Sequence, residues 1–90
     1  MAMYLVAERM LRGRTVMDAT QIQELLEAAA TAEDGLEHVY AEGDLEGVHA
    51  VLFFRATSHE CARSAAHRIM ARLLERDELQ GWERAQVNLG

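Results

Sequence analysis

Residues 36–55 read LEHVYAEGDLEGVHAVLFFR, and they contain two short runs in which apolar and polar side chains alternate. Alternation with a period of two is typical of a β-strand that buries one face. The two runs flank the acidic segment GDLEG, and a short glycine-containing connection between such runs indicates a β-hairpin. We therefore expect residues 36–55 to form two paired antiparallel strands.

A helix is predicted before this hairpin. Asp18 as the N-cap residue and Gln21 three positions later form a capping-box pattern. Apolar side chains then recur at helical spacing and predict one buried stripe, formed by Ile22, Leu25, Leu26 and Ala29. Gly35 suits the left-handed position that ends many helices, so we expect this helix to end near Gly35.

A second helix is predicted after the hairpin. Thr57 and Glu60 match a capping box, with Thr57 as the N-cap residue. The buried stripe of this helix is expected to consist of Ala62, Ala65, Ala66, Ile69, Met70 and Leu73. The pattern breaks in the segment ERDELQG, which we interpret as the connection to a last strand.

Two outer strands complete the pattern, one at residues 3–10 and one at residues 82–89. The resulting order, βαββαβ over residues 1–90, predicts a single α+β domain. This is the ferredoxin-like arrangement, which we expect to have a four-stranded antiparallel sheet of order 4-1-3-2 and two helices on one face.

The two faces of the predicted sheet differ in character. An even-numbered hairpin loop, for example one with Asp44-Leu45 at its tip, places Val39 opposite Ala50 and Tyr40 opposite His49. The side chains expected beneath the helices are then Leu5, Ala7, Val39, Ala41, Ala50, Leu52, Phe54, Ala85 and Val87. The opposite face is expected to carry Tyr4, Val6, Glu8, His38, Tyr40, His49, Val51, Phe53, Trp82 and Arg84.

The opposite face is unusually rich in aromatic and histidine side chains for a surface in contact with water, so we expect a second subunit or a ligand to cover it. The candidate ligand-binding or interface residues are Tyr4, His38, Tyr40, His49, Phe53, Trp82 and Arg84. If the chain is an enzyme, His38 or His49 is the candidate general base and a tyrosine hydroxyl orients the substrate. The alternative, which we favour, is that these residues are half-buried at an interface.

Charge and composition exclude several classes of protein. Half of the residues are hydrophobic, which argues against a disordered chain. The net charge is −6, and residues 18–54 contain nine acidic side chains and no arginine or lysine. Such an acidic segment repels a phosphate backbone, so nucleic acid is not an expected partner. No segment is long enough to span a membrane, and one cysteine fits a reducing compartment, so we expect a cytoplasmic protein.

Two histidines, the cysteine and a cluster of arginines bear on possible metal and anion sites. His59 and His67 are too far apart along a helix to share one ion, so no metal site is expected. Cys61 follows the predicted helix start, where its pKa would be lowered, or it borders the core as a buried thiol. Three arginines surround Gly13 and form a candidate anion site, or else they are surface charges that balance the acidic segment; they are Arg9, Arg12 and Arg14.

In topology and size, the chain resembles two groups of small ferredoxin-like proteins, and Gly43-Asp44 is similar to the turn of the second. The first group is the dimeric α+β-barrel proteins, which include cofactor-free monooxygenases, cyclases and isomerases. The second is the effector-binding domain of Lrp/AsnC-type regulators. The resemblance implies a homodimer without a cofactor. We expect a small dimeric ligand-binding or regulatory module that uses the sheet face opposite the helices. The alternatives are a cofactor-independent enzyme acting on an aromatic or acyl substrate and, third, an accessory subunit of a larger complex.

Overall fold

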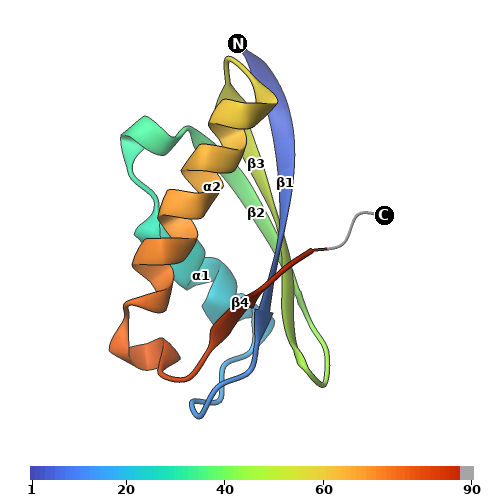
Figure 1. Cartoon of the computed structure of the whole chain (residues 1–90), viewed down its shortest axis with the longest axis vertical. Helices are drawn as coiled ribbons and strands as arrows, with labels where there is room; N and C mark the ends of the chain where they lie inside the picture. The colour runs from blue at the N-terminus through green and yellow to red at the C-terminus, as the bar shows by residue number, and fades with distance from the viewer. Residues whose placement is uncertain (88–90) are drawn as a thin grey trace.

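The computed structural model describes residues 1–87 and has four strands and two α-helices in these residues (Figure 1). All neighbouring strands are antiparallel, and their order is β2-β3-β1-β4. Read from the other edge this is 4-1-3-2, so the predicted α+β class and strand order are confirmed and agree with a ferredoxin-like topology. The elements are β1 (Ala2–Leu11), α1 (Ala19–Ala29), η1 (Ala32–Asp34), β2 (Leu36–Gly43), β3 (Gly47–Ala56), α2 (His59–Leu74), η2 (Asp77–Leu79) and β4 (Glu83–Ala85).

Both helices pack on one face of the sheet, as Figure 1 shows, and the core lies between the two layers. α1 contacts β2 and β3, whereas α2 contacts β1 and β3. The predicted helix stripes are largely buried there, and Leu25 alone of the first stripe is only partly covered. The largest fully buried side chains are Phe54, Met10, Ile22, Leu26, Leu52, Ile69, Met70, Leu73 and Leu79. No helix within residues 1–87 has the length and apolarity needed to cross a membrane.

The helix boundaries differ in part from the sequence prediction. The capping box of Asp18 and Gln21 is confirmed, with the Gln21 amide donating to the Asp18 carboxylate at 2.8 Å. α1 nevertheless ends at Ala29, and Gly35, at φ 73°, ends the short 3-10 helix η1 instead. η1 forms because Asp34 turns inward to accept hydrogen bonds from Thr31. The second helix has Ser58, one residue after the predicted Thr57, as its N-cap.

The hairpin register is shifted by two residues from the expected one. Val39 lies opposite Leu52, and Tyr40 lies opposite Val51. The shift moves the tip of the hairpin from Asp44-Leu45 to Leu45-Glu46, because Asp44 closes the turn against Gly47: its N–H donates to the Gly47 carbonyl at 2.9 Å, and its carboxylate accepts from the N–H groups of Glu46 and Gly47. A shift of two leaves every side chain on its predicted face, because side chains alternate with a period of two.

β1 is turned over relative to the expectation, which is therefore wrong for this strand. Tyr4 pairs with Phe54, and Val6 with Leu52, so the even-numbered side chains of β1 face the helices. Leu5 and Ala7 lie on the opposite face instead. A charged residue, Glu8, is consequently buried beneath the helices. The local sequence gave no sign of its distant partner, Arg84, described below.

The last strand is shorter than predicted. β4 covers only Glu83–Ala85 and pairs with residues 9–11 of β1. Trp82 precedes it and is buried, with its indole N–H donating to the Thr15 carbonyl at 3.0 Å. The end of the predicted strand, at residues 88 and 89, lies outside the described residues.

Candidate functional site

One candidate site is the sheet face opposite the helices, here called the open face. Its two central rows run across three strands: His38, Phe53 and Leu5 in one, Tyr40, Val51 and Ala7 in the other. Leu5 and Tyr40 are more than half exposed, at 54% and 53%, and Met3 is 48% exposed. The open face consists of Met3, Leu5, Ala7, Arg9, His38, Tyr40, His49, Val51 and Phe53.

Charged side chains lie at both ends of the apolar rows. At the hairpin end, the two terminal nitrogens of Arg9 donate hydrogen bonds to the two carboxylate oxygens of Asp44, at 2.7 and 3.0 Å. At the other end, Arg55 donates to Glu37 at 2.7 Å. The open face therefore has an apolar centre, in which the His38 and Phe53 rings lie 5.6 Å apart, between two charged ends.

The open face contains some of the predicted site residues but not others. His38, Tyr40, His49 and Phe53 share it, as the period-two pattern predicted. The remaining three predicted members are on the helix side, which corrects their expected placement: they are Tyr4, Trp82 and Arg84. Their displacement follows from the reversed face of β1 and from the inward turn at the start of β4.

The arginine cluster near Gly13 is largely used within the protein. The Arg12 guanidinium donates to the carbonyls of Asp44 and Met17 and lies 5.8 Å from the Trp82 ring centre. The hydrogen bond between Arg9 and Asp44 raises the pKa of the Arg9 guanidinium and holds the pKa of the Asp44 carboxyl far below its usual range. Both arginines thus attach the hairpin turn to β1. The Arg14 side chain makes no hydrogen bond within residues 1–87.

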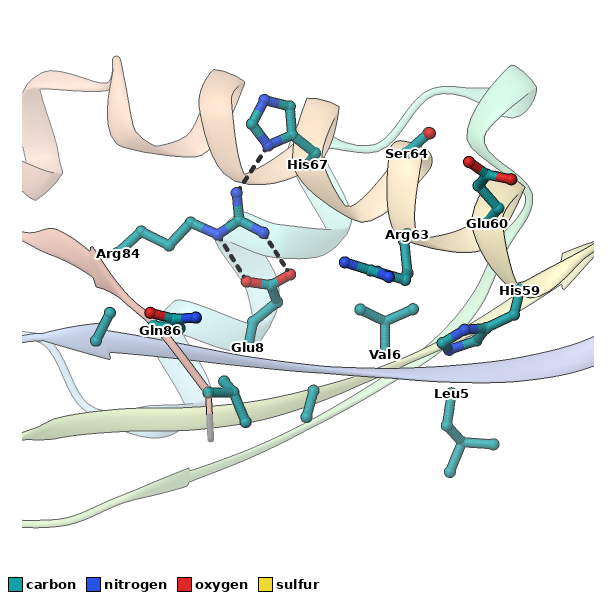
Figure 2. Close-up of a pocket in the computed structure, with 13 residues that line it drawn as sticks. Leu5, Val6, Glu8, His59, Glu60, Arg63, Ser64, His67, Arg84 and Gln86 are labelled. Carbon is teal, nitrogen blue, oxygen red and sulfur yellow. Dashed lines mark hydrogen bonds and ion pairs between the residues drawn. The ribbon is translucent and has the colours of Figure 1, made fainter. Parts of the chain in front are cut away.

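The second candidate site is a cavity of about 830 Å³ between α2 and β1 (Figure 2). It exists because β4 pairs only with the last three residues of β1, which leaves the edge of residues 2–8 without a neighbouring strand. α2 covers this edge from above. The cavity is lined by Leu5, Val6, Ala7, Glu8, His59, Glu60, Arg63, Ser64, His67, Arg84, Ala85, Gln86 and Val87.

A buried ion pair forms one end of this cavity. Arg84 donates to both carboxylate oxygens of Glu8, at 2.8 and 2.9 Å, and Glu8 is only 4% exposed. A further nitrogen of Arg84 lies 2.8 Å from His67 Nδ1. A guanidinium can only donate, so Nδ1 accepts and the proton of the neutral ring resides on Nε2. Both oxygens of the Glu8 carboxylate therefore accept a hydrogen bond, and His67 presents its Nε2–H as a donor.

Two other side chains extend from α2 toward β1, as Figure 2 shows. Arg63 forms no ion pair or hydrogen bond within residues 1–87, and its guanidinium lies above Val6. His59 lies nearer the helix start, with its ring centre 6.0 Å from that of Tyr4. His59, Arg63 and His67 are all exposed on α2, and only the folded sheet reveals that β1 lies beneath this face of the helix.

The histidine, cysteine and acidic side chains are the candidates for metal binding and for thiol chemistry. No group of three or more His, Cys, Asp or Glu residues within residues 1–87 is arranged to hold a metal ion. Cys61 is an exposed free thiol rather than a core residue. Hydrogen bonds from the Ser58 and Thr57 hydroxyls lower the pKa of this thiol.

Comparison of the chain with protein-family models, with curated proteins and with solved structures finds no match. Its function must therefore be inferred from the geometry of the open face and of the cavity.

Proposed function

We propose that this protein is a small homodimeric binding module in which two copies pack through their open faces. The observation that carries the proposal is the pair of apolar rows centred on Phe53 and Val51, which are surrounded by charged side chains. An apolar centre with a polar rim is the usual anatomy of a protein–protein interface. Exposed apolar area that is concentrated on one face also indicates an interaction surface.

A second copy is the occupant that suits this face best. A two-fold axis brings the same surface of both subunits together, so a self-complementary surface is required. The open face meets this requirement when the strands of the two sheets run in opposite directions. The hairpin end, where Glu42 and Glu46 lie beside the Arg9–Asp44 pair, then faces the Arg55–Glu37 pair of the other copy. A domain of 90 residues also gains stability from dimerisation, because its own core is small.

We propose, more specifically, that this chain is similar to the dimeric α+β proteins rather than to the monomeric members of the fold. The support is an open face that is apolar at its centre and exposes Leu5 and Tyr40. In such a module, the outer surface of the helices and the cavity between α2 and β1 remain accessible for a ligand or a regulatory partner.

The test is the mass of the protein in solution, with two matched substitutions of exposed apolar residues. Tyr40→Asp places a charge in the centre of the open face, whereas Leu45→Asp changes a 99% exposed side chain at the hairpin tip. We expect the wild type and Leu45→Asp to sediment at twice the chain mass of 10.1 kDa, and Tyr40→Asp at the monomer mass. A wild type that stays monomeric at high concentration would refute the proposal.

A cofactor-independent enzyme is the second candidate, and the cavity favours it. Two histidines reach this cavity, whereas His38 and His49 lie on the open face, so the base would be His59, beside the Tyr4 ring. An imidazole next to a phenol can remove a proton and orient an oxygen atom of an acyl or aromatic substrate. Turnover that is abolished by His59→Ala but retained in His49→Ala would support this candidate; the reverse result would exclude His59 as the base.

A further inference from the structure

We propose that the cavity between α2 and β1 binds small carboxylates that carry a short apolar body, with Arg63 holding the carboxylate. This inference does not rest on the proposed dimer, because the cavity lies on the helix side of the sheet and the dimer contact on the other side. The two sites share only Leu5 and Ala7 of β1, and the other residues of the cavity lining lie outside the open face as defined above.

The first support is the state of the arginines around the cavity. Arg84 directs its donors to Glu8 and His67, whereas Arg68 and Arg72 are paired with Asp34. Arg63 has no such partner within residues 1–87, yet it extends from α2 over the cavity. A planar guanidinium recognises a carboxylate through two parallel N–H bonds, so Arg63 can hold such a group without breaking an existing contact.

The second support is that no free carboxylate of the lining faces β1 inside the cavity. Both oxygens of Glu8 already accept from Arg84. The Glu60 carboxylate lines the rim and points away from β1 in Figure 2. His67 is fixed with its remaining N–H as a donor, as argued above. The remaining polar lining residues, His59, Ser64 and Gln86, bear no negative charge, so a ligand carboxylate would meet donors at Arg63 and His67 and no free carboxylate facing β1.

The third support is the apolar floor. Val6 points from β1 toward Arg63, and Val87 adds apolar surface to the lining, whereas the Leu5 side chain points to the other side of β1 in Figure 2. Cavities that bind small molecules commonly measure about 300–1,000 Å³, and this one falls in that range at about 830 Å³. An alkyl chain on Val6 with its carboxylate at Arg63 satisfies both parts of the site.

The experiment is a titration of the full-length protein with hexanoate, followed through its backbone amide NMR spectrum. Hexanol and hexylamine serve as ligands of matched shape without the negative charge, and inorganic phosphate serves as an anion without the apolar body. The variants are Arg63→Gln, Arg63→Glu and, as a control, Arg14→Glu, which changes an arginine remote from the cavity lining. Circular dichroism establishes that each variant is folded.

We expect saturable hexanoate binding with shifts concentrated in α2, the first half of β1 and β4. Arg63→Gln should weaken it about tenfold or more, as for other charge-assisted pairs. Arg63→Glu should instead prefer hexylamine, and Arg14→Glu should bind hexanoate like the wild type. The proposal is overturned if hexanoate does not bind, if hexanol or phosphate binds as tightly, or if Arg63→Gln has no effect. Sedimentation of the same samples shows separately whether the dimer is present.

Discussion

Arg84 on β4 binds both carboxylate oxygens of Glu8 on β1, although the two residues are 76 positions apart in the sequence. In the sheet register Arg84 lies opposite Met10, so its side chain reaches back along β1 to Glu8. β4 pairs with β1 through only three residues, and this ion pair extends the attachment beyond that short ladder. The same pair forms one end of the cavity and neutralises the buried carboxylate of Glu8.

The ion pair leads to a prediction about stability. Arg84→Met leaves the buried Glu8 carboxylate without its partner, and breaking a buried pair in this way is strongly destabilising. Because Arg84 is partly exposed, we expect a loss of about 2 to 3 kcal/mol in the free energy of unfolding. The double variant Glu8→Leu/Arg84→Met removes both charges and should recover most of that loss. Urea unfolding of the single and double variants measures the difference.

Arg55→Met provides the control, because Arg55 forms its ion pair with Glu37 on the exposed surface of the sheet. Exposed pairs contribute about 1 kcal/mol or less, so this variant should unfold close to the wild type. A double variant at positions 8 and 84 that is no more stable than Arg84→Met would contradict the idea that the unpaired carboxylate causes the loss.

A second prediction concerns acid. Burial alone would raise the pKa of Asp34, but hydrogen bonds from the Thr31 backbone and hydroxyl, together with Arg72 and Arg68, outweigh it and lower the pKa. A lowered folded-state pKa stabilises the protein above the unfolded value of about 3.9, and this stabilisation is lost as the pH falls through the folded-state value. We expect Asp34→Asn to cost about 2 kcal/mol near pH 7.

The measurement is urea unfolding of the wild type and of Asp34→Asn from neutral pH down to about pH 2. The gap between the two proteins should be constant near neutral pH and should shrink below about pH 4. Asp18→Asn is a useful control, since an asparagine caps a helix about as well as an aspartate. A gap that is unchanged in acid would mean that the carboxylate charge of Asp34 does not contribute.

The hairpin shows how much of the fold can be predicted from the sequence. The alternation in residues 36–55 identified both strands and the face on which each side chain lies. These faces are correct although the predicted register was wrong by two residues. The register itself depends on the Asp44 turn, whose hydrogen bonds with Glu46 and Gly47 place the tip at Leu45-Glu46 rather than at Asp44-Leu45. Period is a property of the local sequence, whereas register depends on geometry across the turn.

β1 shows why the candidate site could be predicted only in part. Both faces of residues 3–10 are similarly apolar, so alternation could not select the buried one, and Glu8 favoured the wrong choice. Its burial is compensated by Arg84, a contact that no local pattern reveals. The cavity depends on the same contact and on the shortness of β4, and it was therefore missed. The open-face residues of β2 and β3 were found because their alternation is clear.

A third prediction tests the close approach of β1 and the hairpin. A Cβ added at Gly47 would lie 1.9 Å from the Met10 carbonyl oxygen, so Gly47→Ala forces the backbone apart. We expect a loss of about 2 kcal/mol or more in the free energy of unfolding.

At Gly43, on the other side of the turn, the nearest atom to an added Cβ is a flexible Arg12 nitrogen at 3.6 Å. Gly43→Ala should therefore change stability by less than about 1 kcal/mol. Thermal unfolding of the two variants provides the comparison, and equal losses would contradict this steric explanation.

A fourth prediction concerns Trp82, whose indole contacts connect the start of β4 to the segment after β1. Its N–H donates to the Thr15 carbonyl, and the Arg12 guanidinium lies over its ring. Trp82→Phe keeps an aromatic ring but leaves the Thr15 carbonyl unpaired, and we expect a loss of about 1 to 2 kcal/mol. Amide hydrogen exchange should show where this loss acts. Faster exchange confined to β4 and residues 12–17 is expected, because local contacts set local opening; a uniform increase over α1 and β3 would show instead that Trp82 supports the whole core.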